Sequence, residues 1–216
     1  LSKTKKVVSG IYEENSHKIV PVNDCLIQSE VINRVLKSVN QALSKNKITP
    51  FVNGGIIKHV LVRHALRTGQ IMVVLVTPSD FFPGRANFVK DLLKLEPEIT
   101  TIVQNVQSRD TSIVLGTKER VIYGKGFIID ELCGLKFKLS PRSFFQINPI
   151  QTEKLYGIAM DFANLRSGNT VIDAYSGIGT IGMVASKNAG KVICVENNPD
   201  AVKDAKFNAT YNKINN

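Results

Sequence analysis

The stretch from residue 169 to residue 196 constrains the fold of this chain more than any other. A short apolar run, NTVIDAY, precedes a glycine-rich turn, a helical segment and a second apolar run, KVICVE. Glycines in such a turn let the backbone bend sharply and approach a ligand closely, because no Cβ is in the way. Glu196 ends the second run, where a carboxylate can accept both hydroxyls of a ribose. The pattern predicts the opening of a parallel, doubly wound sheet.

The helices around these strands fit the same interpretation. Residues 148–164 carry an apolar side at helical spacing, with Asn148 as the cap and Pro149 at the first helical position. A further helix is expected over residues 199–213. Only two strands of the parallel sheet are present, whereas such sheets normally contain more strands and are covered on both faces. We therefore expect the chain to be a fragment that stops inside this domain.

The residues before 141 mix helices and strands without strict alternation. Helices are expected over 29–45, with Ser29 as the cap, and over 85–95, and a hairpin is expected to turn at Arg67, Thr68 and Gly69. Further short strands are expected near residues 100–107, 112–116, 120–124, 126–132 and 135–140. The pattern predicts an α+β central domain over residues 1–140, followed by the start of the α/β domain over residues 141–216.

The charge of the chain favours an anionic partner. Its 28 basic and 18 acidic residues give a net charge of +10, and residues 1–150 carry +9 of it. No stretch approaches the roughly 18 consecutive apolar residues of a membrane helix, and no apolar run of a signal peptide follows the first lysines. Three widely spaced cysteines fit a reducing cytoplasm better than a disulfide framework. We expect a cytoplasmic protein, and its oligomeric state stays open.

The glycine turn has more than one interpretation. Residues 177–182, GIGTIG, match the G-x-G-x-x-G pattern of dinucleotide sites, which taken alone is weak. Asp173, four residues before Gly177, makes the turn resemble instead the first motif of S-adenosylmethionine-dependent methyltransferases, D-x-x-x-G-x-G. The run ENNP at 196–199 resembles their second motif. The alternatives are an NAD-dependent oxidoreductase and a plain tight turn with a surface glutamate.

A second motif lies upstream, in residues 139–149, LSPRSFFQINP. It resembles the S-P-x-S-F-x-Q-x-N signature of RNA uracil-5 methyltransferases, which methylate carbon 5 of uridine in tRNA and large-subunit rRNA. The stretch from Gly10 to Cys25, with His17, is similar to another motif of that family. Residues 59–63 are similar to its R-H-x-x-V-R strand, although Lys58 replaces the first arginine. The resemblance covers the chain from about Val8 to its end and implies a Rossmann-like S-adenosylmethionine-dependent methyltransferase fold, incomplete at the C-terminus.

The resemblance implies roles for residues of the second domain. Gln146 would contact the methionine part of the cofactor or the target base, and Glu196 would hold the ribose. The cofactor pocket would also be lined by the turn and its neighbours, namely Tyr175, Gly177, Gly179 and Thr180. One of the two phenylalanines, Phe144 or Phe145, is expected only to pack within the linker between the domains.

The resemblance also implies which groups the chain lacks. The nucleophilic cysteine and the general base of the family would lie beyond Asn216, so the chain alone is expected not to methylate RNA. Cys194 is expected in the core and Cys133 in a hairpin turn, so neither is expected to replace them. Cys25 matches one ligand of the four-iron cluster that many family members bind. Since one thiolate cannot hold such a cluster, no metal is expected in this chain, and a 4Fe-4S cluster is an expectation for the full-length parent only.

The RNA partner is expected to be 23S rRNA rather than tRNA, because of the Cys25 region and the basic first half. An RNA-facing surface around the hairpin is a hypothesis from charge alone, and it comprises Lys58, Arg63, Arg67 and Arg85. The alternatives are a tRNA uracil-5 methyltransferase and a module that binds RNA without acting on it.

Overall fold

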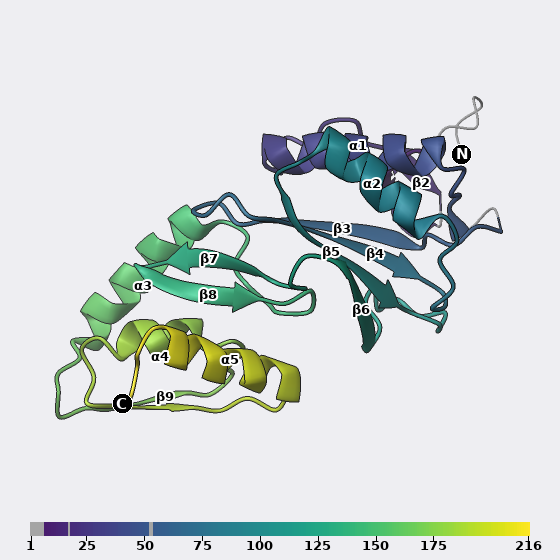
Figure 1. Ribbon diagram of the computed structural model, residues 1–216. Coiled ribbons are helices and arrows are strands. Elements are labelled where there is room, and N and C mark those ends of the chain that lie inside the picture. The colour runs from purple at the N-terminus through teal and green to yellow at the C-terminus, as the bar shows by residue number, and fades with distance from the viewer. Residues whose placement is uncertain (1–6, 17, 52–53) are drawn as a thin grey trace. The chain divides into compact units, whose positions relative to one another are not determined.

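The computed structural model describes residues 7–16, 18–51 and 54–216, and His17 of the motif between Gly10 and Cys25 lies outside them. The chain divides into two compact units. The first unit comprises Leu1–His64 and Gln70–Gly126, and the second comprises Ala65–Gly69 and Phe127–Asn216. The architecture is the predicted combination of an α+β part and the start of an α/β part (Figure 1).

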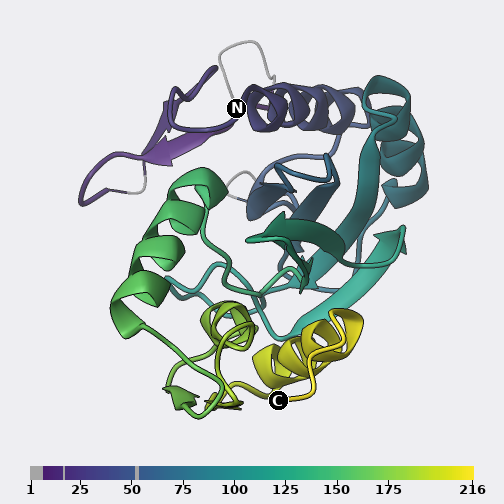
Figure 2. The same cartoon turned by 90° about the vertical axis from the view of Figure 1, so that its left-hand side faces the viewer.

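The first unit is built on a four-stranded sheet in the order β3 (His59–His64), β4 (Ile71–Thr77), β5 (Ile99–Val106) and β6 (Lys118–Tyr123). Strands β4 and β5 are parallel and joined by helix α2 (Arg85–Leu95), whereas β3 and β6 run antiparallel to their neighbours. Helices α1 (Glu30–Lys45) and α2 lie on one face of this sheet (Figure 1). Strands β1 (Gly10–Tyr12) and β2 (Ile19–Pro21) form a separate exposed ribbon, purple in Figure 2.

The core of the first unit lies between the two helices and the sheet. Every second residue of β4 points toward the helices, as the alternation of a strand requires. One buried apolar cluster includes Val35 and Val39 of α1, Val73 and Leu75 of β4, and Phe88 of α2. The predicted helices over 29–45 and 85–95 and the predicted hairpin are confirmed.

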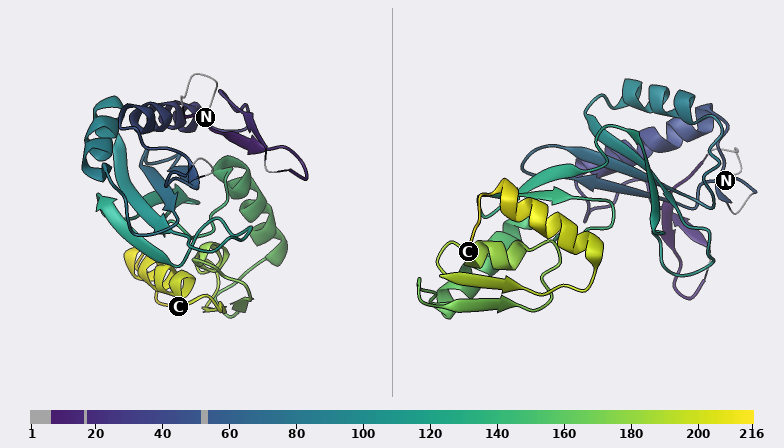
Figure 3. Two further views of the ribbon diagram at one scale, coloured as in Figure 1. Left: turned by 90° about the vertical axis from the view of Figure 1, so that its right-hand side faces the viewer. Right: turned by 60° about the horizontal axis from the view of Figure 1, so that its bottom comes forward.

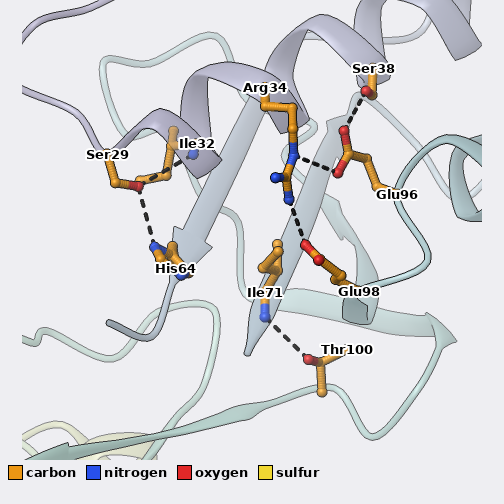
Figure 4. Close-up of polar contacts among 9 residues, drawn as sticks. All are labelled: Ser29, Ile32, Arg34, Ser38, His64, Ile71, Glu96, Glu98 and Thr100. Atoms are coloured by element: carbon orange, nitrogen blue, oxygen red, sulfur yellow. Dashed lines mark hydrogen bonds and ion pairs between the residues drawn. The ribbon is translucent and has the colours of Figure 1, made fainter. Parts of the chain in front are cut away.

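Polar contacts fix the position of α1 (Figure 4). The Ser29 hydroxyl caps the helix by accepting the N–H of Ile32, as predicted, and lies 3.3 Å from Nδ1 of His64. The buried carboxylate of Glu96 accepts hydrogen bonds from Nε of Arg34 at 3.0 Å and from the Ser38 hydroxyl at 2.7 Å. Because a buried carboxylate is costly without partners, these bonds hold α1 to the turn that precedes β5.

The second unit begins with a hairpin of β7 (Ile128–Leu132) and β8 (Leu135–Leu139). After helix α3 (Pro149–Ala163) come the remaining elements, which are β9 (Thr170–Asp173), α4 (Thr180–Ala185), β10 (Lys191–Cys194) and α5 (Pro199–Tyr211). Strands β9 and β10 are parallel, and α4 and α5 lie on the same face of them (Figure 3). Asn148 caps α3 and Asn198 caps α5, each followed by a proline at the first turn.

The structure corrects one predicted strand. Residues 112–116 form a loop, because the side chain of Asn105 takes the place of a pairing strand. Its Oδ1 accepts the N–H of Gly116 at 2.7 Å, and its Nδ2 donates to the carbonyl of the same residue at 3.0 Å. Gln107 holds the same loop through Nε2, which donates to the carbonyl of Ile113.

The division into units differs from the expected boundary at residue 140, because the β7–β8 hairpin groups with the second unit. The turn of residues 65–69 explains this grouping. The buried carboxylate of Asp130 on β7 accepts the backbone N–H groups of Leu66 and Arg67 at 3.1 and 3.0 Å. The hydroxyl of Thr68 donates to the carbonyl of Ile129. No helix within the described ranges is long and apolar enough to cross a membrane.

Candidate functional site

The turn between β9 and α4 adopts a conformation that needs its glycines. Gly177 and Gly179 have φ angles of 55° and 87°, in the left-handed region that favours glycine. A Cβ on Gly179 would lie 2.6 Å from Cε of Met183, so the end of that side chain would have to shift. A Cβ on Gly177 would meet no atom within 4 Å. The backbone at Gly177 is therefore open to a ligand.

Asp173, the last residue of β9, organises the start of α4. The cap position of this helix is Gly179, which has no side chain to offer. Instead Oδ2 of Asp173 accepts the N–H of Gly182 in the first turn at 2.9 Å. A carboxylate there satisfies an unpaired N–H group and lies at the positive end of the helix dipole. The acid of the D-x-x-x-G-x-G motif thus has a structural role.

Glu196 lies at the carboxyl end of the sheet, against the glycine turn. Its Oε2 accepts the N–H of Gly177 at 2.8 Å, and its Oε1 accepts the N–H of Asn198 at 2.8 Å. The N–H groups of Asn198 and Gly177 hold the pKa of this carboxyl below its ordinary value. Because each carboxylate oxygen has a second lone pair, Glu196 remains an oriented anionic acceptor.

The residues on either side of the turn differ in exposure. Tyr175 is 97% exposed, so its ring is available to a ligand. The Thr180 hydroxyl lies 3.1 Å from the hydroxyl of Tyr156, a buried residue of α3. Burial raises the pKa of Tyr156. Sequence reasoning missed Tyr156, because it does not belong to the apolar side predicted for residues 148–164. The structure buries it together with Pro149 and Thr152.

The segment of residues 139–149, which carries the S-P-x-S-F-x-Q-x-N pattern and is called the signature segment below, exposes one of its two phenylalanine rings and buries the other. Phe145 is buried against Phe137, with ring centroids 6.1 Å apart, whereas Phe144 is exposed. The expectation that one of the pair serves packing is confirmed. Gln146 is exposed, and within the described part of the chain no hydrogen bond joins it to the glycine turn.

Helix α5 holds this segment through polar side chains spaced four residues apart, Asp200, Asp204, Asn208 and Asn212. Such a spacing puts them on one face of the helix. The row runs along β8, where Oδ1 of Asn212 accepts the N–H of Lys136 at 2.8 Å and Oδ1 of Asn208 accepts that of Lys138 at 2.7 Å.

The same row continues beyond β8 into the signature segment. Asp204 accepts the Ser143 hydroxyl at 2.8 Å and forms a buried ion pair with Nζ of Lys138 at 2.9 Å. Arg142 pairs with Asp200. The four-residue spacing was readable from the sequence, but its partners were not.

A cavity of about 240 Å³ lies between α4, β10 and α5, with Ser176, Met183, Cys194, Glu196 and Val202 among its lining residues. The expectation that Cys194 is a core residue is wrong, because the residue is exposed at the short two-stranded sheet. Its thiol lines the cavity. Desolvation raises the pKa of this thiol, and the nearby carboxylate of Asp173 adds a smaller effect in the same direction.

The other two cysteines have local backbone roles. Cys133 lies in the turn between β7 and β8 with a φ of 51°, as predicted, and its N–H donates to Glu153. Burial raises the pKa of its thiol, and Glu153 adds to the effect. Cys25 is half-buried, and Asn33 binds both its N–H and its carbonyl. Within residues 7–16, 18–51 and 54–216, no three His, Cys, Asp or Glu side chains group to hold a metal ion.

The four basic residues of the charge hypothesis fall in different surroundings. Nζ of Lys58 donates to the carbonyls of Gln107 and Arg109. Arg67 forms a 2.7 Å ion pair with Glu153, and both residues belong to the second unit. The remaining two, Arg63 and Arg85, are half-buried in the first unit, and burial lowers the pKa of Arg63.

The parallel pair, the glycine turn that opens α4 and the carboxylate that follows β10 form the strand, turn, helix and strand arrangement expected from the sequence. The structure resembles that of Pyrococcus abyssi tRNA (uracil-54, C5)-methyltransferase in complex with S-adenosyl-L-homocysteine. The TM-score is 0.77 at 23% identity, over 94% of this chain and 49% of that one. This likeness establishes the fold.

Sequence comparison finds relatives that carry the name RNA methyltransferase. The chain is 40% identical over 218 residues to an uncharacterized RNA methyltransferase of Oceanobacillus iheyensis, over 99% of this chain and 48% of the relative. It is 39% identical to an uncharacterized RNA methyltransferase of Caldanaerobacter subterraneus subsp. tengcongensis, over 98% of this chain and 48% of the relative. The chain thus spans about half the length of the curated relatives it matches. No protein-family model matches it.

Proposed function

We propose that this chain is the central and early cofactor-binding part of an enzyme that methylates carbon 5 of uridine in RNA, with 23S rRNA as the target. The cofactor is S-adenosylmethionine. The observation that carries the proposal is the contact between Gly177 and Glu196, which joins an open backbone turn to an oriented carboxylate. Similarity to proteins named RNA methyltransferases and the basic first half of the chain support the RNA substrate.

The residues of the turn fit the parts of this cofactor. Glu196 accepts the ribose hydroxyls, while the missing Cβ of Gly177 lets the ligand approach the backbone. The exposed ring of Tyr175 flanks the purine or an extruded base. Thr180 and Gly179 complete the floor of the site, and the exposed Gln146 offers a donor and an acceptor to the methionine part or to the base. When bound, S-adenosylmethionine supplies the methyl group.

The proposal assigns no nucleophile to the cysteines of this chain. Carbon 5 of uracil is a poor nucleophile, so a thiolate has to add at carbon 6 before the methyl transfer. A base then removes the carbon-5 proton, and the thiolate leaves carbon 6 as the double bond re-forms. Desolvation raises the pKa of both Cys133 and Cys194, which disfavours their thiolates. The chain by itself is therefore proposed to bind the cofactor without methylating RNA. Cys25 is proposed as a ligand of a four-iron cluster in the full-length parent only, because one thiolate cannot hold such a cluster.

RNA is proposed to contact the basic residues around the hairpin. Two of the four candidates, Lys58 and Arg67, also hold partners within the chain, so RNA phosphate would compete with those contacts. Contacts of this kind bind phosphate without reading sequence. A cytoplasmic location follows from the proposed substrate.

A second candidate target is tRNA. The solved structure with the same fold is a tRNA methyltransferase, which favours this alternative. Deleting the gene and measuring 5-methyluridine by mass spectrometry separates the targets. Loss of the modification from 23S rRNA is expected, loss from tRNA alone would replace the target, and no loss from either RNA would overturn uridine methylation.

Calorimetric titration with S-adenosylhomocysteine tests the cofactor site in the chain itself. We expect binding by the unaltered chain and at least tenfold weaker binding by Glu196→Ala. The control is Asp161→Ala, which removes an exposed carboxylate from α3. Binding that survives Glu196→Ala would overturn the role of Glu196. A chain that binds nothing would favour an RNA-binding module without a cofactor.

A further inference from the structure

The side-chain amide of Asn208 connects two segments of the second unit. Asn208 is fully buried on α5. Its Oδ1 accepts the N–H of Lys138 on β8 at 2.7 Å, and its Nδ2 donates to the carbonyl of Ile178 at 3.2 Å. One amide group thus bonds β8 at one end and the glycine turn at the other. Because the two ends differ chemically, the amide cannot turn over without losing both bonds.

Ile178 is the residue between the two glycines of the turn. Glycine has the least intrinsic conformational preference of any residue, so the peptide groups on either side of Ile178 need an outside contact to fix them. The peptide group between Ile178 and Gly179 is held at both ends. The N–H of Gly179 donates to the carbonyl of Ser176 at 2.7 Å, and the carbonyl of Ile178 accepts from Asn208.

The same helix face also holds the signature segment. Lys138 lies two residues before Ser140, and one helical turn before Asn208 the carboxylate of Asp204 accepts the Ser143 hydroxyl. Helix α5 therefore contacts both motifs through adjacent members of one row. A shift of the row displaces the turn and the segment together.

We propose that Asn208 is a positioning residue, which sets the conformation of the glycine turn relative to β8 and the signature segment. It touches no ligand and acts through the carbonyl of Ile178. The expected effect of Asn208 on S-adenosylmethionine binding rests on the proposed function. The effect of Asn208 on the conformation of the turn does not.

Two matched variants test the proposal in the full chain. Asn208→Asp keeps the acceptor for Lys138 and removes the donor to Ile178. Asn212→Asp makes the same change one helical turn later, where the amide bonds Lys136 and the helix backbone but not the turn. Hydrogen exchange of the Gly177 and Gly179 amides is compared with that of the β9–β10 ladder, and S-adenosylhomocysteine affinity is measured by calorimetry.

We expect Asn208→Asp to speed exchange at the turn at least tenfold relative to the ladder, and to weaken S-adenosylhomocysteine binding at least tenfold. Asn212→Asp should change each value less than twofold. Unchanged turn exchange in Asn208→Asp, or equal effects of the two variants, would overturn the proposal. Should Asn208→Asp not fold, Asn208→Ser replaces it with the same expectations. An unaltered chain that binds no S-adenosylhomocysteine contradicts the proposed function, while the exchange difference still decides the role of Asn208.

Discussion

The backbone N–H of Gly177 donates to Oε2 of Glu196 over 2.8 Å, across 19 residues of sequence. The other carboxylate oxygen accepts the N–H of Asn198, which begins the approach to α5. Hydrogen bonds therefore connect the turn after β9 to the segment that follows the carboxyl end of β10. A group that binds at this edge of the sheet meets a carboxylate that is already charged and oriented.

The charge of Glu196 makes the stability of the chain depend on pH. Its pKa in the folded chain lies below the ordinary value of 4.5, because the N–H groups of Asn198 and Gly177 stabilise the carboxylate. This stabilisation is fully present above pH 4.5 and is lost as the pH falls through the lower folded pKa. The difference in melting temperature between the chain and Glu196→Gln should be largest near neutral pH and should shrink in acid. A difference that is constant over the pH range would contradict this prediction.

Removing the carboxylate of Asp173 should destabilise the start of α4. Asp173→Ala leaves the N–H of Gly182 without its partner, in a helix whose cap residue is a glycine. The expected loss is about 1 kcal/mol of unfolding free energy, as for other capping residues. Urea unfolding measures it. Asp161→Ala, which removes an exposed carboxylate of α3, should stay within about 0.5 kcal/mol of the unaltered chain, and equal effects would argue against capping.

Breaking the buried ion pair between Lys138 and Asp204 should cost more. The two side chains are 16% and 5% exposed, and Asp204→Ala leaves the ammonium group of Lys138 without its carboxylate. The expected loss is about 3 to 5 kcal/mol in urea unfolding. Asp80→Ala breaks an exposed pair with Lys118 and should cost at most about 1 kcal/mol.

A double variant checks the cause of that loss. Lys138→Met combined with Asp204→Ala removes both charges of the pair. It should cost less than Asp204→Ala alone, because no buried charge is left without a partner. A larger loss in the double variant would show that the charge of Lys138 is not the origin of the effect.

Replacing one glycine of α3 by alanine should stabilise the chain. Gly157 lies on an exposed part of α3, and a Cβ there would meet no atom within 4 Å. Gly157→Ala should raise the unfolding free energy by about 0.5 to 1 kcal/mol, because glycine is a poor helix former. Thermal melting measures the gain. Gly179→Ala should do the opposite, since its φ is 87° and its Cβ would lie 2.6 Å from Met183. Destabilisation by Gly157→Ala would contradict the open space around it.

The elements predicted correctly are those whose signals are local. Ser29 and Asn148 are capping residues that predict where their helices begin. The spacing of Asp173, Gly177 and Glu196 is that of the βαβ template. Glu196 accepts the N–H of Gly177, whereas Asp173 accepts the N–H of Gly182. The local pattern was enough to predict the strands and the turn that carry these residues.

The errors arise where partners are distant in sequence. Residues 112–116 have the composition of a strand, but the amide of Asn105 occupies the backbone groups that a strand would use. The hydrogen bond between Thr180 and Tyr156 and the ion pair of Arg67 with Glu153 likewise join elements that no local pattern connects. Charge counts located the basic residues without revealing that some of them already have partners.

The bonds from Asp130 to the turn of residues 65–69 also set an order of events during synthesis. Asp130 is made 64 residues after Leu66, which at about 5 to 20 residues per second is an interval of roughly 3 to 13 seconds. Until then the N–H groups of Leu66 and Arg67 have only water as a partner. The nascent hairpin of β3 and β4 therefore leaves the ribosome with an unfinished tip, which is completed when β7 arrives.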